Sequence, residues 1–78
     1  MKNVIITGSA NGVGKAIAKI LKDENLILID VDENNLEKIA IETHSEYYVC
    51  DVSEEEQIDK FIKDIKKKYE KIDCLINC

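Results

Sequence analysis

The sequence predicts an α/β fold in which strands and helices alternate as β-α-β-α-β-α-β to form a doubly wound parallel sheet. Three observations support this prediction. Short runs that are apolar on every residue end at glycine or acidic residues, as is typical of strands buried on both faces. The stretches between them carry apolar residues at helical spacing. All three glycines lie together, where the first strand turns into the first helix.

Four short stretches, mainly apolar, are the expected strands. They cover residues 4–6, 26–29, 46–50 and 74–76. The second run is followed by Asp30 and the third by Asp51. We therefore expect acidic side chains at the carboxyl ends of two strands.

Three helices are expected between these strands, each with one apolar face. The expected buried faces are Val13, Ile17, Ile20 and Leu21 in the first helix, Leu36, Ile39 and Ala40 in the second, and Ile58, Phe61, Ile62, Ile65 and Tyr69 in the third. Ser53 and Glu56 predict a capping box at the start of the third helix. Acidic residues 54–56 and lysines 66–68 lie at the ends where the helix dipole favours them.

Composition limits the organisation and the partners. With 78 residues, the chain is expected to be one small domain, residues 1–78. The net charge of -5 argues against nucleic acid as a partner. No apolar run is long enough to span a membrane, and the first strand begins directly after Asn3, so a cytoplasmic location is expected. Three cysteines without a CxxC pair predict free thiols and no metal site.

The stretch TGSANGVG at residues 7–14 is the most informative part of the sequence. Backbone N–H groups can approach a pyrophosphate closely at the start of a helix only where no Cβ intervenes, so clustered glycines at this turn favour a phosphate site. A tight turn without a ligand is the alternative, but glycines serving only as turns would be scattered among the other connections.

The spacing of the glycines excludes two other phosphate-binding motifs. A Walker A loop requires glycine at Ser9 and a hydroxyl residue at Ala16. The G-x-G-x-x-G pattern requires glycine at Ile17. The pattern that fits is T-G-x-x-x-G-x-G, which resembles the short-chain dehydrogenase/reductase family, and other motifs of that family follow in order.

The resemblance covers the whole chain and implies an incomplete Rossmann-like domain with the strand order 3-2-1-4. Asp30 ends the second strand, where an acidic residue can bind the adenosine ribose. Asp51 and Val52 match a pair that faces the adenine. Asn77 matches the first residue of the N-N-A-G motif, whose second position is occupied here by Cys78, and the chain is expected to be truncated within that motif. The implied cofactor-binding residues are Gly8, Ser9, Asn11, Gly12, Val13, Gly14, Asp30, Val31, Asp51, Val52 and Asn77.

Four of these residues leave alternatives open. Asp30 could instead anchor the next helix together with Asp32. Asp51, directly before Ser53, is equally suited to helix-start chemistry. Ser9 could bind the cofactor or only hold the turn, and the same alternatives apply to Asn11.

The expected cofactor is NAD rather than NADP. A carboxylate at Asp30 would repel a 2′-phosphate. Family members that prefer NADP usually carry a basic residue within the glycine loop or just after the second strand, where this chain has Asn11 and Val31.

The resemblance implies hydride transfer between NAD and a carbonyl or alcohol in the full-length family. The family's catalytic Tyr-x-x-x-Lys is absent from this sequence, so the chain alone is expected to be inactive. The alternatives are a stand-alone nucleotide-binding or interaction module and a degenerate fragment. Marginal stability or self-association is expected, because the strand at residues 74–76 would be an unpaired edge beside a partly uncovered sheet face.

Overall fold

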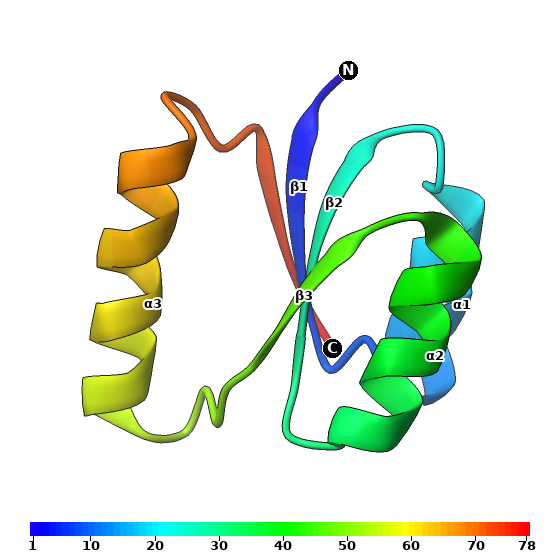
Figure 1. Cartoon of the computed structure of the whole chain (residues 1–78), viewed down its shortest axis with the longest axis horizontal. Coiled ribbons are helices and arrows are strands. Elements are labelled where there is room, and N and C mark those ends of the chain that lie inside the picture. The colour runs from blue at the N-terminus through cyan, green and yellow to red at the C-terminus, as the bar shows by residue number, and fades with distance from the viewer.

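The structure is a computed structural model that describes residues 1–78. Its elements, in chain order, are β1 (Asn3–Thr7), α1 (Gly12–Ile20), β2 (Asn25–Asp30), α2 (Glu33–Thr43), β3 (Glu46–Val49), α3 (Glu55–Lys68) and β4 (Cys74–Asn77). The four strands form one parallel sheet in the order β3-β2-β1-β4 (Figure 1). The predicted fold class and strand order are therefore confirmed.

The register of the sheet brings the ends of the strands together. Thr7 at the end of β1 pairs with Ile29 of β2 on one side and with Asn77 of β4 on the other. Asp30 pairs with Val49 of β3. The loops that follow β1, β2 and β3 therefore all emerge at one edge of the sheet, where ligands bind in open α/β folds.

Helices cover both faces of the sheet, which explains why residues 4–6 and 26–29 in the two central strands are all apolar. Helices α1 and α2 lie on one face and α3 lies on the other (Figure 1). Successive strand residues point alternately into two separate cores, one on each face of the sheet. The core beneath α1 and α2 contains the strand residues Val4, Ile6, Leu26 and Leu28. The core beneath α3 contains Ile5, Ile27 and Ile29.

The buried face of α1 differs from the sequence prediction. Val13 and Ile20 are 70% and 78% exposed, so their predicted burial was wrong. The face toward the sheet consists of Gly14, Ile17, Ala18 and Leu21, a row at spacings of three and four. Its small residues let α1 approach the glycine loop and β1 closely, and this close approach sets the rotation of the helix. The buried face predicted for α2 is confirmed.

The predicted capping box at α3 is also wrong. The Ser53 hydroxyl donates to Asp51 Oδ1 at 2.6 Å, and the Ser53 N–H donates to the same oxygen at 3.0 Å. Because both Ser53 donors are used in this turn, Ser53 does not cap the helix, which begins two residues later at Glu55. The N-cap residue is Glu54, whose side chain makes no capping hydrogen bond. The predicted charges in the first and last turns of α3 are confirmed.

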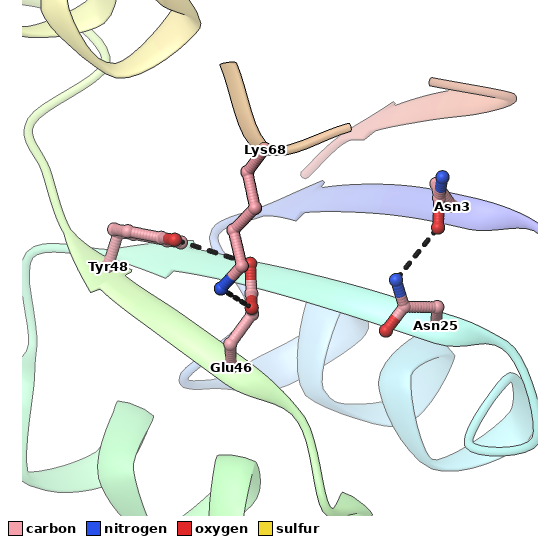
Figure 2. Close-up of polar contacts among 5 residues, drawn as sticks. All are labelled: Asn3, Asn25, Glu46, Tyr48 and Lys68. Carbon is pink, nitrogen blue, oxygen red and sulfur yellow. Dashed lines mark hydrogen bonds and ion pairs between the residues drawn. The ribbon is translucent and has the colours of Figure 1, made fainter. Parts of the chain in front are cut away.

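Polar contacts at the amino ends of the strands fix the scaffold far from the loop edge (Figure 2). Lys68, the last residue of α3, donates from Nζ to Glu46 Oε2 at 2.7 Å, and Tyr48 Oη donates to Glu46 Oε1 at 3.3 Å. Burial, followed by the nearby Glu46 charge, raises the pKa of Tyr48. The Asn25 side chain donates to Asn3 Oδ1 at 2.7 Å across β2 and β1. These contacts hold α3 to β3 and β2 to β1.

Asp73 provides an acid-sensitive contact at the start of β4. Its Oδ2 accepts the Asn3 backbone N–H at 2.7 Å, and this bond, more than Lys71, lowers the pKa of Asp73 below its ordinary value of 3.8. A carboxyl whose pKa is lower in the folded state stabilises the fold above its unfolded pKa, and this stabilisation is lost as the pH falls through its folded pKa. We expect urea unfolding to show declining stability below pH 3.8.

The variant Asp73→Asn tests this assignment. We expect it to be less stable than the wild type at pH 7 and to decline less steeply below pH 3.8, because one titrating group is gone. The decline should not disappear, because the pKa values of Asp32 and Asp51 are also lowered. Parallel pH profiles for the two proteins would show that Asp73 does not couple folding to protonation.

Candidate functional site

The loop between β1 and α1 depends on its glycines. Gly8 and Gly12 adopt φ values of +64° and +59°, the left-handed region that side chains disfavour. Gly14 lies inside α1, where an added Cβ would overlap the carbonyl oxygen of Gly8 and lie 3.1 Å from the Ser9 Cα. The loop thus folds directly onto the first turn of the helix.

Ser9 holds this loop to the neighbouring strand. Its N–H and its Oγ both donate to the carbonyl oxygen of Ile29, at 3.3 Å and 3.2 Å. The residue is fully buried. Of the two roles considered for its hydroxyl, holding the turn is the one that the geometry shows.

The first turn of α1 offers free backbone donors. The first bond into the helix runs from the Lys15 N–H to the Asn11 carbonyl oxygen at 3.3 Å. Asn11 is the N-cap residue, but its side chain does not cap the helix. The N–H groups of Gly12, Val13 and Gly14 therefore have no acceptor within the chain. Such a helix end, with its partial positive charge, can bind an anion.

Asp30 lies beside this loop, and its carboxylate is already partly engaged. Its Oδ2 accepts the Ala10 N–H at 2.9 Å, and its Oδ1 accepts the N–H groups of Val31 and Asp32 at 2.7 Å and 3.3 Å. These bonds place the carboxylate between the glycine loop and the turn before α2. Since a carboxylate has about four acceptor positions, one on Oδ2 remains for a ligand hydroxyl.

The cap of α2 is provided by Asp32 rather than Asp30. Its Oδ1 accepts the Asn35 N–H at 3.3 Å, and its Oδ2 accepts the side-chain amides of Asn35 and Asn11 at 2.8 Å and 3.0 Å. These bonds lower the pKa of Asp32 below 3.8, and the bond from Asn11 has the largest effect. Neither Asp32 nor Asn35 was among the predicted site residues, although an Asp directly before a helix is itself a capping signal.

Asp51 and Val52 form the turn after β3. Two hydrogen bonds from Ser53 lower the pKa of Asp51 below 3.8, and the bond from the Ser53 side chain has the larger effect. The Asp51 N–H donates to Gln57 Oε1 at 2.9 Å, a contact that the sequence did not suggest. The Asp51 carboxylate thus holds the turn before α3 and does not cap the helix itself. Val52 is exposed, and its N–H has no acceptor in the chain.

Thr7 and Asn77 meet where β1 and β4 end. The Thr7 hydroxyl donates to Asn77 Oδ1 at 2.8 Å and accepts the Cys78 N–H at 3.4 Å. Thr7 is buried. The ends of β1 and β4 are therefore joined by a direct side-chain contact.

A groove of about 360 Å³ extends from these residues along the α3 face of the sheet. Its lining is mainly apolar and consists of Ile5, Thr7, Ile29, Val52, Ile58, Phe61, Ile62, Leu75 and Asn77. Ile62 and Leu75 on its rim are 42% and 58% exposed, so the burial predicted for Ile62 was wrong. The reason is that α3 is the single helix on this face (Figure 1), and the neighbouring strand β4 is largely exposed.

Two further structural findings concern the chain as a whole. None of its helices is both long and apolar enough to cross a membrane. No group of three or more His, Cys, Asp or Glu side chains is placed to hold a metal ion.

The model of the short chain dehydrogenase family matches residues 2–78. The chain belongs to this family. Among the curated relatives of this chain is the NAD-dependent glycerol dehydrogenase of Listeria innocua, 32% identical over 81 residues that span 97% of the chain and 32% of the relative. The chain thus spans about a third of the length of the relatives it matches.

Solved structures of short-chain dehydrogenases have the same fold. An alcohol dehydrogenase from Thermococcus sibiricus, complexed with 5-hydroxy-NADP, matches with a TM-score of 0.88 and 34% identity over 96% of this chain and 35% of that one. A short chain dehydrogenase/reductase from Burkholderia phymatum, in complex with NAD, matches with a TM-score of 0.86 and 26% identity over 95% of this chain and 29% of that one. Members of the family thus bind NAD or NADP.

Proposed function

We propose that this chain is the nucleotide-binding part of an NAD-dependent short-chain dehydrogenase. The observation that carries the proposal is the set of three free N–H groups at the start of α1, next to the Asp30 carboxylate. Both lie at the carboxyl edge of the sheet, near the point where the chain changes from one face to the other. A dinucleotide needs this combination, because it presents phosphates and ribose hydroxyls a few ångströms apart.

Each part of the cofactor has residues of matching chemistry. Gly8, Gly12, Val13 and Gly14 would bind the pyrophosphate through backbone N–H groups. Asp30 would accept a ribose hydroxyl at its open Oδ2 position, next to Val31. The Asp51 carboxylate and the free Val52 N–H would bind the adenine edge. Ser9, Asn11 and Asn77 would support these contacts by fixing the loops.

The bound dinucleotide would supply a hydride for a carbonyl substrate or accept one from an alcohol. In full-length members of the family the proton is transferred by a Tyr-x-x-x-Lys pair, which this sequence lacks. We therefore assign cofactor binding to this chain and expect no dehydrogenase activity from it alone. Free thiols at Cys50, Cys74 and Cys78 support a reducing compartment such as the cytoplasm.

The proposal predicts that the chain prefers NAD to NADP. A 2′-phosphate would lie beside the Asp30 carboxylate with no lysine or arginine at Asn11 or Val31 to compensate. We expect calorimetric titration at low salt to show NAD binding about tenfold more tightly than NADP, corresponding to about 1.4 kcal/mol. Equal affinities would contradict the NAD preference, and the absence of binding by both dinucleotides would contradict the proposed function.

We also propose that the chain associates with a second copy of itself through β4. This edge strand carries no charged residue, and its Leu75 side chain adjoins the apolar groove. Unprotected apolar edges pair readily with other strands. The opposite edge, β3, is different, because its Glu46 is held in an ion pair with Lys68 at 2.7 Å.

Substituting Leu75→Lys should therefore reduce the sedimentation coefficient to that of a monomer. The charge would be placed on the β4 edge without removing a buried side chain. The matched control is Val49→Lys on the β3 edge, a similarly exposed aliphatic residue, which should leave association unchanged. A monomeric wild type, or equal effects of the two variants, would contradict pairing through β4.

A further inference from the structure

Asn11 is unusual for an N-cap residue because its side chain serves another helix. An N-cap asparagine ordinarily accepts a hydrogen bond from the second or third N–H of its own helix, here Val13 or Gly14. In this chain Asn11 Nδ2 donates to Asp32 Oδ2 at 3.0 Å, and Asn11 Oδ1 accepts from Asn35 Nδ2 at 3.3 Å. Both polar ends of the side chain are therefore held by the start of α2.

Asp32 is the centre of this contact. Its carboxylate accepts one hydrogen bond from Asn11 and two from Asn35. Its backbone N–H donates to the Asp30 carboxylate. The carboxylate also fixes the orientation of the Asn11 amide, because the reverse orientation would bring the amide oxygen against a negative charge. With Asp32 removed, only the 3.3 Å bond from Asn35 Nδ2, an amide that Asp32 also orients, would keep the Asn11 oxygen from turning to its own helix.

The difference between the two helix ends shows what the contact does. At α2 the N-cap side chain satisfies the Asn35 N–H. At α1 an equally suitable capping residue leaves its helix uncapped. The uncapped Val13 and Gly14 N–H groups are among those assigned to the pyrophosphate, and a capping Asn11 would compete for them.

We propose that Asp32 is a positioning residue that holds the Asn11 side chain away from α1 and so keeps the helix end open for phosphate. The identity of the ligand rests on the proposed function, but the effect on the helix end does not. Asp32 would touch neither phosphate nor ribose itself. It would act only through Asn11.

The first experiment needs no ligand. Amide hydrogen exchange of Val13 and Gly14 is compared by NMR between the wild type and Asp32→Ser. Serine remains a good N-cap for α2 but is too short to hold Asn11. We expect slower exchange at one or both amides in Asp32→Ser, and return to fast exchange in Asn11→Ala/Asp32→Ser. Unchanged exchange in Asp32→Ser would overturn the proposal.

The second experiment measures the competition with ligand. We expect Asp32→Ser to weaken NAD binding about fivefold, corresponding to about 1 kcal/mol for a capping bond, and to leave adenosine binding unchanged. In an Asn11→Ala background, Asp32→Ser should have no further effect, because no side chain remains to cap α1. An equal loss in both backgrounds would overturn the proposal.

The two experiments separate the possible failures. If the wild type binds no NAD, the proposed function fails, and the exchange of Val13 and Gly14 still decides the role of Asp32. If NAD binds and the exchange is insensitive to Asp32, the proposed function stands and the positioning role fails. Asn35→Ala, which spares the bond between Asp32 and Asn11, should have a smaller effect on exchange than Asp32→Ser.

Discussion

Gly14→Ala is expected to destabilise the chain by about 3 kcal/mol, at the upper end of the range for overpacking. The added Cβ would overlap the Gly8 carbonyl oxygen and lie 2.8 Å from the carbonyl carbon. Both atoms are backbone, so relief requires the glycine loop to move off α1. A domain of this size has about 4–12 kcal/mol of stability in total, so the loss is a large fraction. Urea unfolding followed by circular dichroism measures it.

Gly12→Ala is the matched control, in the same loop and with the same change of one methyl group. A Cβ at Gly12 would have no atom within 4 Å, but its φ of +59° would be strained. We expect a loss of about 1 kcal/mol, the usual penalty for an L-residue in the left-handed region. A Gly14→Ala variant no less stable than Gly12→Ala would show that the loop does not need to pack this closely on α1.

The contrast between these glycines also shows what the sequence could predict. The T-G-x-x-x-G-x-G spacing located the loop, and strand runs such as residues 26–29 predicted the parallel sheet. Both depend on local patterns that tertiary contacts leave unchanged. The face of α1 was predicted wrongly because hydrophobicity favoured Val13 and Ile20, whereas the approach of Gly14 to Gly8 sets the rotation. A contact between two glycines cannot be predicted from the hydropathy of the sequence.

The site was predicted residue by residue, but its internal connections were not. Asp30 and Asp51 each end a strand, so their positions followed from the strand boundaries. The bonds of Asp32 to Asn11 and Asn35 join the starts of two different helices. The distance between those helix ends depends on the strand register, which the apolar runs do not specify. Likewise, Ser53 resembles a cap in sequence, but in the structure it binds Asp51 instead.

The Asp30→Ala variant is expected to bind NAD about thirtyfold more weakly than the wild type. A hydrogen bond to a charged group contributes about 2 kcal/mol, and the substitution removes the acceptor assigned to the ribose. NADP should lose much less affinity, because the repulsion between Asp30 and the 2′-phosphate disappears with the carboxylate. Titration calorimetry with both dinucleotides measures the two affinities on one protein.

The ratio of the two affinities is the decisive quantity, because Asp30 also holds the Ala10 and Val31 N–H groups. If the loop is disordered in Asp30→Ala, NAD and NADP lose affinity by the same factor, since both need the loop for the pyrophosphate. If Asp30 binds the ribose, the preference for NAD shrinks or reverses. Asp23→Ala removes the same charge from an exposed position between α1 and β2 and controls for net charge. An unchanged ratio in Asp30→Ala would limit Asp30 to holding the loop and would leave the NAD preference without its cause.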